Sequence, residues 1–208
     1  MWEQSPLPWQ AALEEAWAAY CAGSLPIGAA LIDADGSLIA RGRNRLLDSA
    51  ADGDPTHLRR HTMAHAELNA LITFGQKQPD PRTVTLYTTL EPCAMCMGAT
   101  IASGIKTIAF LVPDPLRGAG DLPAATERMR AQGIRVLGPQ PDMLGNLAIA
   151  LLVARMLQVG PLPVLPPTMA EAFAYGIALG ETLFYNGTLE QRCAQRATTA
   201  HILADLVP

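Results

Sequence analysis

Two short groups of residues have the types and spacing of a metal centre. The first is His65-Ala66-Glu67, and the second is Pro92-Cys93-Ala94-Met95-Cys96, whose first cysteine follows His65 by 28 positions. Zinc prefers thiolate and imidazole ligands, and three protein ligands leave a fourth position for water. We therefore expect His65, Cys93 and Cys96 to hold a catalytic Zn²⁺ ion.

Glu67 has the chemistry of a proton carrier beside such a metal. Zinc lowers the pKa of a coordinated water towards neutrality, so a nearby carboxylate can accept the proton and later return it. His-x-Glu followed by Pro-Cys-x-x-Cys is the signature of zinc deaminases. The sequence therefore predicts hydrolytic removal of an exocyclic amino group as ammonia, with Glu67 as the catalytic residue.

Three other interpretations of these residues deserve comparison. A thioredoxin-type redox pair would leave His65 and Glu67 without a role, and a structural zinc site would need a fourth ligand. His61 is the candidate for that ligand, but it lies in the polar run HLRRHTM and is expected to be solvated or hydrogen-bonded. A zinc-stabilised assembly subunit without turnover stays open, although Glu67 argues against it.

The metal ligands constrain the elements that carry them. Residues two apart in a helix do not share a face, so His65 should lie at the very start of its helix if Glu67 is to face the same site. Cys93 and Cys96 are three apart and should open another helix, where the unpaired backbone N–H groups favour thiolates. Pro92 suits that entry because it supplies no donor.

The remaining pattern predicts an α/β fold. A helix is expected over 9–22, followed by a β-hairpin of IGAALID and SLIARGR around Ala34-Asp35-Gly36 and a polar loop over 48–62. Strands and helices then alternate, so the connections after residue 83 should be parallel crossovers. The expected helices are 65–74, 93–103, 122–132 and 142–157, and the expected strands are 83–88, 106–112 and 134–137.

A proline-rich run predicts where the catalytic domain ends. We expect a deaminase domain over 1–158, an extended linker over 159–167 containing GPLPVLPP, and a helical extension over 168–208. Two apparent capping boxes, Thr168-Met-Ala-Glu171 and Thr188-Leu-Glu-Gln191, predict a helical hairpin. Its apolar residues should pack on the body or across a dimer. They include Phe173, Ile177, Leu183 and Phe184.

Composition limits the environment and the partners. Half of the 208 residues are hydrophobic and 16% are charged, with a net charge of −4 and only two lysines, which gives little attraction to a polyanion. The start MWEQSPLPWQ does not read as a secretory signal, and the longest apolar stretch, 147–154, is too short to span a membrane. We therefore expect a cytoplasmic protein without membrane contact, in which Cys21 and Cys193 are ordinary thiols.

Residues 9–157 resemble the cytidine and deoxycytidylate deaminase superfamily, especially the branch of tRNA adenosine, guanine and cytosine deaminases. Three segments carry the resemblance: Leu25-Pro26-Ile27-Gly28-Ala29, Gly42-Arg43-Asn44-Arg45, and residues 89–99, TLEPCAMCMGA. The resemblance implies a cytidine-deaminase-like, three-layer α/β/α sandwich. Its sheet would be mixed and five-stranded, with an antiparallel first hairpin and a parallel remainder. It also implies a homodimer.

The resemblance also assigns roles to individual residues. It makes His65, Cys93 and Cys96 zinc ligands and Glu67 the proton shuttle. It makes Asn44 a base-contacting side chain, since an amide can both donate and accept hydrogen bonds. The other residues that it places at the substrate are Ile27, Gly28, Ala64 and Pro92, with Asp114 near the mouth of the pocket.

The C-terminal region departs from the tRNA-editing members of this branch. Those enzymes resemble one another in a basic C-terminal helix, whereas residues 141–208 here contain three arginines, no lysine and five acids, a balance of 3 − 5 = −2. A basic rim of arginines at 41, 43, 45, 59 and 60 could still form, although nearby acids such as Asp48, Asp52 and Asp54 could pair with it. The expected substrate is a free nucleobase, nucleoside or related small heterocycle, and tRNA adenosine is the alternative.

Overall fold

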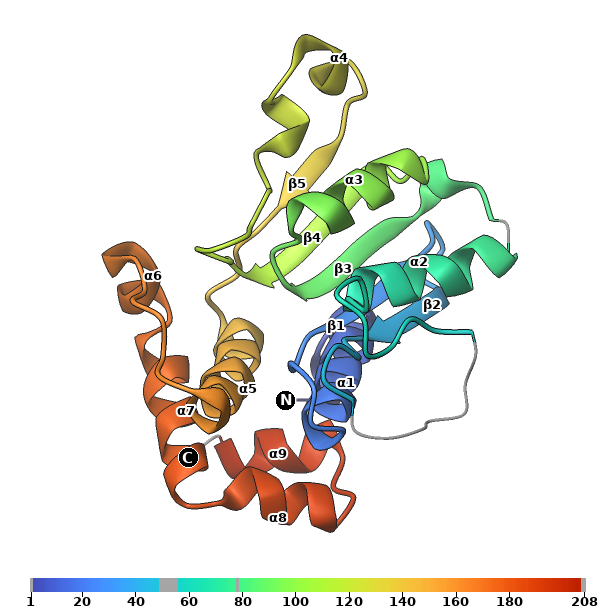
Figure 1. Ribbon diagram of the computed structural model, residues 1–208. Helices are drawn as coiled ribbons and strands as arrows, with labels where there is room; N and C mark the ends of the chain where they lie inside the picture. The colour runs from blue at the N-terminus through green and yellow to red at the C-terminus, as the bar shows by residue number, and fades with distance from the viewer. Residues whose placement is uncertain (1, 49–55, 78, 207–208) are drawn as a thin grey trace.

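The protein is seen in a computed structural model that describes residues 2–48, 56–77 and 79–206 (Figure 1). Residues 49–55 of the predicted polar loop over 48–62, including Asp52 and Asp54, lie outside the described residues. Within the described ranges, no helix is both long enough and apolar enough to cross a membrane.

A mixed five-stranded sheet forms the centre of the structure. Its strands are β1 (Gly28–Ile32), β2 (Leu38–Arg43), β3 (Thr85–Leu90), β4 (Thr107–Val112) and β5 (Arg135–Leu137), in the spatial order β2-β1-β3-β4-β5. Strand β1 pairs antiparallel with β2 and β3, whereas β3, β4 and β5 are parallel. The predicted hairpin and the predicted parallel crossovers are both confirmed.

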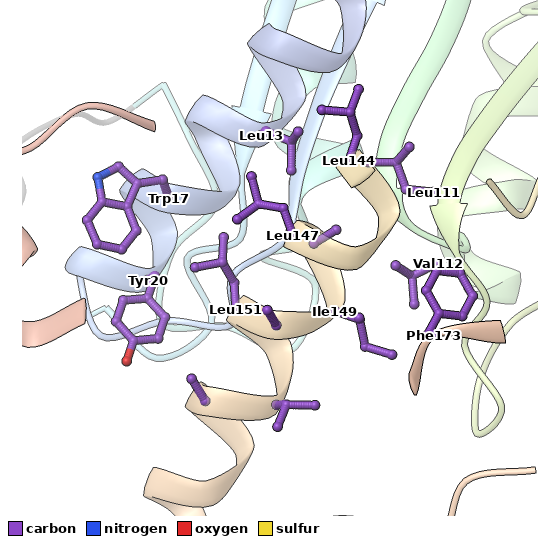
Figure 2. Packing of buried hydrophobic residues seen from close by; sticks show 14 of the residues in the cluster. Leu13, Trp17, Tyr20, Leu111, Val112, Leu144, Leu147, Ile149, Leu151 and Phe173 are labelled. Atoms are coloured by element: carbon purple, nitrogen blue, oxygen red, sulfur yellow. The ribbon is translucent and has the colours of Figure 1, made fainter. Parts of the chain in front are cut away.

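Helices cover both faces of the sheet and create two hydrophobic clusters. On one face, α1 (Leu7–Cys21) packs over β1, β2 and β3 and α5 (Met143–Val159) packs over β3 and β4, and side chains such as Leu13 and Leu147 meet between the two helices (Figure 2). On the other face, α2 (Ala66–Lys77) and α3 (Ala94–Ala102) bury Phe74 and Met97. Because the central strands are covered on both sides, β1 and β4 read as nearly continuous apolar runs. The three-layer α/β/α prediction is confirmed.

The predicted helix over 122–132 is wrong for most of its length. The predicted range instead contains a short 3-10 helix at Leu122–Ala124 and then α4 (Glu127–Arg130). Two other short 3-10 helices lie elsewhere, at Trp2–Gln4 and Pro81–Thr83. The Thr126 side chain accepts a hydrogen bond from the Met129 backbone N–H and so caps a new helix in the middle of the predicted one. Most side chains from 124 to 133 are exposed, so little tertiary packing extends this helix.

The C-terminal extension is helical, as predicted, but it contains four helices where a two-helix hairpin is expected. These are α6 (Pro167–Ala172), α7 (Ala174–Tyr185), α8 (Thr188–Ala194) and α9 (Thr199–Leu206). Neither predicted capping box forms, because Thr168 already lies inside α6 and Thr188 follows the N-cap Gly187. The Thr188 hydroxyl instead donates to Asn186 Oδ1.

Helix α7 packs closely against α5 through two glycines. A Cβ atom on Gly176 would lie 2.5 Å from the Asn146 carbonyl oxygen, and one on Gly180 would lie 2.6 Å from the Ala150 carbonyl oxygen. Side chains of the extension join the cluster that α1 and α5 form, which confirms that the extension packs on the body. These are Met169, Phe173, Leu183, Leu189 and Ile202. Helices α8 and α9 then lead back towards α1 (Figure 1).

A disulfide joins the two ends of the fold. Cys21 at the end of α1 and Cys193 in α8 are bonded, with an S–S distance of 2.04 Å, so the expectation of two ordinary thiols is wrong. The sequence gives no sign that α8 returns to α1, and that return brings the two Cα atoms within 5.3 Å. Nearby, the Tyr20 hydroxyl donates to Glu190 and the Trp17 indole N–H donates to the Ala197 carbonyl.

We expect the Cys193→Ser variant to be less stable than the oxidised protein by about 2–4 kcal/mol, because the bond restricts the unfolded chain over a separation of 172 residues. Denaturant unfolding with and without a thiol reductant measures this difference. Reductant should lower the unfolding midpoint of the wild type and leave that of the variant unchanged. Equal midpoints for the wild type under both conditions would contradict the prediction.

Candidate metal centre and substrate cavity

The two helix starts on one face of the sheet bring the three predicted zinc ligands together. Helix α2 begins at Ala66, so His65 lies just before it, and Cys93 is the N-cap residue of α3. His65 Nδ1 lies 3.7 Å from Cys93 Sγ and 3.4 Å from Cys96 Sγ. The expectation that His65 sits where the backbone is still turning into its helix is confirmed.

The spacing of these donor atoms fits zinc. A tetrahedral ion with Zn–S bonds of about 2.3 Å and Zn–N bonds of about 2.0 Å would place the sulfur and nitrogen ligands about 3.6 Å from each other. The observed separations lie on either side of that value, and the three donor atoms all lie within 4.8 Å of one another. In the described part of the chain, no fourth His, Cys, Asp or Glu joins the group. His61 is exposed, and its Nδ1 accepts a hydrogen bond from the Met63 N–H.

The electrostatics of the cysteine pair also call for a cation. Hydrogen bonds with the Cys96 thiol and with His65 lower the pKa of Cys93 to about 3. The same contact with Cys93, together with burial, raises the pKa of Cys96. Without a cation, therefore, only the Cys93 sulfur ionises readily, and a positive ion between the two sulfurs would favour the thiolate form of both.

Glu67 is buried beside the metal ligands. It lies in the first turn of α2, it is 4% exposed, and burial raises its pKa. Among the residues that the structure describes, no arginine or lysine forms a salt bridge with it. A carboxyl group with a raised pKa suits proton exchange near neutral pH.

A cavity of about 430 Å³ opens onto the candidate metal centre. Of the predicted site residues, it is lined by His65, Glu67 and Cys93 and by three of the proposed substrate contacts, Ile27, Asn44 and Asp114. Cys96 is fully buried behind the lining. The residues that reach the metal and those that reach the cavity therefore meet in one place.

Three proposed substrate contacts do not line this cavity. Gly28 instead provides room for α1, since a Cβ atom there would lie 2.0 Å from the Ala12 carbonyl oxygen. The backbone of Ala64 accepts a hydrogen bond from Arg45 N–H, and that of Pro92 accepts one from Ala119 N–H. Ala64 and Pro92 therefore stabilise the backbone of segments next to the site, and Gly28 allows α1 to pack on β1.

The family model described as the cytidine and deoxycytidylate deaminase zinc-binding region matches residues 5–112. The chain belongs to this family. The matched segment contains all three metal ligands and Glu67, so this deaminase-family chain carries the zinc-binding region that the model describes.

Individual deaminases are similar to this chain over part of their length. The tRNA-specific adenosine deaminase of Haemophilus influenzae is 40% identical over 110 residues, which cover 52% of this chain and 58% of that protein. The cytosine deaminase of Candida albicans is 32% identical over 101 residues, which cover 48% of this chain and 60% of that protein. The chain therefore spans less than two thirds of either relative.

A solved deaminase structure is similar as well. The structure of guanine deaminase from Nitrosomonas europaea matches with a TM-score of 0.50 and 26% identity, covering 69% of this chain and 80% of that chain. The chain is therefore similar to deaminases that are named for three different substrates: adenosine in tRNA, cytosine and guanine.

Within this deaminase fold, Asn44 is held in one orientation. Its Oδ1 accepts hydrogen bonds from the Ser24 hydroxyl at 2.8 Å and from the Leu46 backbone N–H at 3.0 Å. A backbone N–H can only donate, so the atom that faces it must be the oxygen. The Nδ2 group is therefore left to donate to a ligand in the cavity. Ser24 is fully buried, and the sequence analysis did not identify it.

We expect the Ser24→Ala variant to lower kcat/KM by up to about tenfold, mainly by raising KM, because one of two hydrogen bonds that orient Asn44 is lost. Steady-state kinetics on a base that the wild type deaminates measures the effect. Ser103→Ala is the matched control, since the Ser103 hydroxyl only bonds to the Ala99 carbonyl at the end of α3. Equal changes in KM for both variants would contradict the positioning role of Ser24.

Glu91 is a second residue that the sequence analysis missed. Its carboxylate accepts hydrogen bonds from the backbone N–H groups of Asp114 and Gly120, at 3.1 and 2.8 Å. It thereby holds the loop that follows β4, of which residues 113–117 line the cavity. Glu91 lies directly before Pro92 in the second motif, but no local signal shows which loop it anchors.

The cavity also has an apolar wall that the sequence did not predict. It comes from α5, from the linker after it and from the start of the extension. The lining residues of this wall are Ile149, Leu152, Val153, Met156, Val159, Leu162, Pro163, Leu165 and Met169. The extension therefore contributes to the site as well as to the core.

Several arginines of the possible basic rim are paired with acids. Arg43 forms a buried, bidentate pair with Asp48, with N–O distances of 2.7 and 2.8 Å. Arg41 contacts Glu14 and Glu15. Among the lining residues of the cavity, Arg117 is the only arginine or lysine. Arg45 lies 3.9 Å from Asp48 as well, so the charges of three of the five arginines of this rim are offset by neighbouring acids.

Proposed function

We propose that this chain is a zinc-dependent hydrolytic deaminase that removes the exocyclic amino group of a free nucleobase, a nucleoside or a related small heterocycle and releases ammonia. The observation that carries the proposal is the juxtaposition in one cavity of three zinc-compatible donor atoms, a buried carboxyl at Glu67 and an oriented amide at Asn44. A site built only for structure has no use for the carboxyl.

The residues of the chain divide the reaction between them. His65, Cys93 and Cys96 would hold the zinc ion, which when bound would supply the Lewis acidity that activates water at neutral pH. Glu67 accepts a proton from the attacking water and delivers it to the ring nitrogen next to the amino-bearing carbon. The second proton of the added water then passes through Glu67 to the amino group and the carbon–nitrogen bond breaks, so that water and the amino heterocycle become the oxo heterocycle and ammonia. Asn44 fixes the ring by donating from Nδ2 to an acceptor on it.

Deamination of adenosine in tRNA is the second candidate. The identity with the tRNA-specific adenosine deaminase of Haemophilus influenzae favours it. Phosphate recognition, however, depends on basic side chains, and here Arg41 and Arg43 are paired while residues 141–208 have a net charge of −2. The similarity to cytosine and guanine deaminases supports a small substrate equally well. These observations together favour the small heterocycle.

A panel of amino-bearing rings tests the proposal. We expect zinc-loaded protein to release ammonia from at least one of guanine, adenine, cytosine, their nucleosides, or pterin and triazine rings. Zinc-free protein is the control, and no release above it across the panel would refute catalysis in favour of an assembly subunit. An anticodon stem-loop belongs in the same panel, because tight binding that falls steeply with salt would favour tRNA. Light scattering of the same samples tests the proposed homodimer.

A further inference from the structure

The substrate cavity has two chemically different sides. The polar groups that line it are those at the metal centre and on the loops around it: Asn44, His65, Glu67, Glu91, Asp114 and Arg117. Every lining residue between positions 149 and 169 is apolar. A ligand that fills the cavity therefore meets reactive polar groups on one side and hydrocarbon on the other.

The apolar side is backed by the hydrophobic core. Ile149, Val153 and Met169 are buried members of the cluster between α1, α5 and the extension. Met156 is half-buried and lines the cavity without belonging to either large core cluster. Helix α7 packs closely on α5 at Gly176 and Gly180, so a second helix supports the helix that carries much of this wall.

The rim of the cavity exposes large apolar side chains. Leu47, Leu116 and Val159 are 46%, 68% and 58% exposed, and all three line the cavity. They come from three separate segments, the loop after β2, the loop after β4 and the end of α5. Exposed apolar residues that gather around a concave site mark a place where a hydrophobic group is bound.

We propose, on the basis of the function proposed above, that this wall is a subsite for a hydrophobic substituent on the amino-bearing ring, and that the substrate is an alkyl- or aryl-substituted heterocycle. The ring presents its amino-bearing carbon to Glu67 and the metal ligands, so a substituent on the far side of the ring extends towards α5. A ribose there would place its hydroxyls against side chains without hydrogen-bonding atoms, which costs free energy. A cavity of about 430 Å³ is within the range that takes more than a bare base.

Binding of matched ligands to the zinc-loaded full chain tests this subsite. The ligand sets are cytosine, cytidine and 1-benzylcytosine; adenine, adenosine and 9-benzyladenine; and guanine, guanosine and 9-benzylguanine, each titrated by calorimetry. We expect at least one benzyl compound to bind about tenfold or more tighter than both its parent base and its nucleoside, since hydrophobic pockets discriminate single methylenes by about that factor. Benzyl compounds that bind no tighter in any set would overturn the subsite.

Two variants of the apolar wall and one control variant test whether the benzyl group binds at this wall. Met156→Gln places an amide on the wall and should weaken binding of the benzyl compound about tenfold more than it weakens binding of the parent base. Leu162→Gln, in the linker, provides a second test outside any helix. Val164→Gln is the control, because Val164 is 95% exposed in the same linker and does not line the cavity. Equal affinities in the two wall variants and the control would refute the assignment.

Parallel assays keep this inference separate from the proposed function. Ammonia release from bases without any benzyl preference would leave the deaminase standing and remove the subsite. Tight benzyl binding without ammonia release from any ligand would support the subsite and refute the deaminase. If a second copy of the chain covers the wall instead, Met156→Gln should lower the dimer fraction by sedimentation and the benzyl compounds should gain nothing, which also overturns the proposal.

Discussion

The Glu67→Gln variant should bind zinc normally and release ammonia at least about a thousandfold more slowly than the wild type, since general acid–base groups contribute factors of that size. Glutamine has nearly the same shape as glutamate, but it cannot accept a proton from water and return it to the ring. Ammonia release under single-turnover conditions, with zinc content measured on the same samples, gives the result.

Loss of zinc from this variant would show instead that Glu67 stabilises the metal centre.

The thermal stability of the metal-free wild type and of the metal-free variant provides a further control. Burial raises the pKa of Glu67 in the folded state, so its stabilising protonated form is lost as the pH rises through that pKa. Above it, the buried charge opposes folding. Metal-free Glu67→Gln protein should therefore unfold at the same or a higher temperature than metal-free wild type at neutral pH.

The Gly28→Ala variant should lose about 4 kcal/mol or more of stability, or fail to fold. The added methyl group would lie 2.0 Å from the Ala12 carbonyl oxygen and 2.5 Å from the Ala16 nitrogen, both backbone atoms of α1. No side-chain rotation relieves such contacts, so α1 would have to move away from β1, and overpacking of this kind is strongly destabilising. Denaturant unfolding measures the loss.

Gly75→Ala is the matched control for this substitution. Gly75 lies in α2, and a Cβ atom there would meet nothing within 4 Å. Alanine is the better helix former, so this variant should gain about 0.5–1 kcal/mol. A Gly28→Ala variant that folds with wild-type stability would contradict the prediction, and a change in its KM would then favour the substrate contact that the family resemblance implies.

The metal centre was predictable because its information is local. The order and spacing of His65, Glu67, Cys93 and Cys96 define the donor set, and the start of a helix determines how the donors point. The strand pattern was predictable for a similar reason, since turns and apolar runs alternate along the chain. Both depend on neighbours in sequence.

Features that depend on distant segments were not predictable from the same patterns. Cys21 and Cys193 are separated by 172 residues, and nothing near either one indicates the other. The family resemblance places Gly28 at the substrate, but no pattern near Gly28 indicates that α1 occupies the space where its side chain would lie. The helix over 122–132 failed because Thr126 caps a separate short helix there.

The glycine contact between α5 and α7 has a consequence for how the proposed ligand preference could be moved to another protein. It joins α7 closely to α5, which carries much of the apolar wall of the cavity, while the zinc ligands and the proton carrier all lie between 65 and 96. The residues proposed to carry out the reaction and those proposed to select the ligand thus lie in separate segments of the chain. Grafting the later stretch onto another family member should transplant the preference, provided that both glycines travel with it.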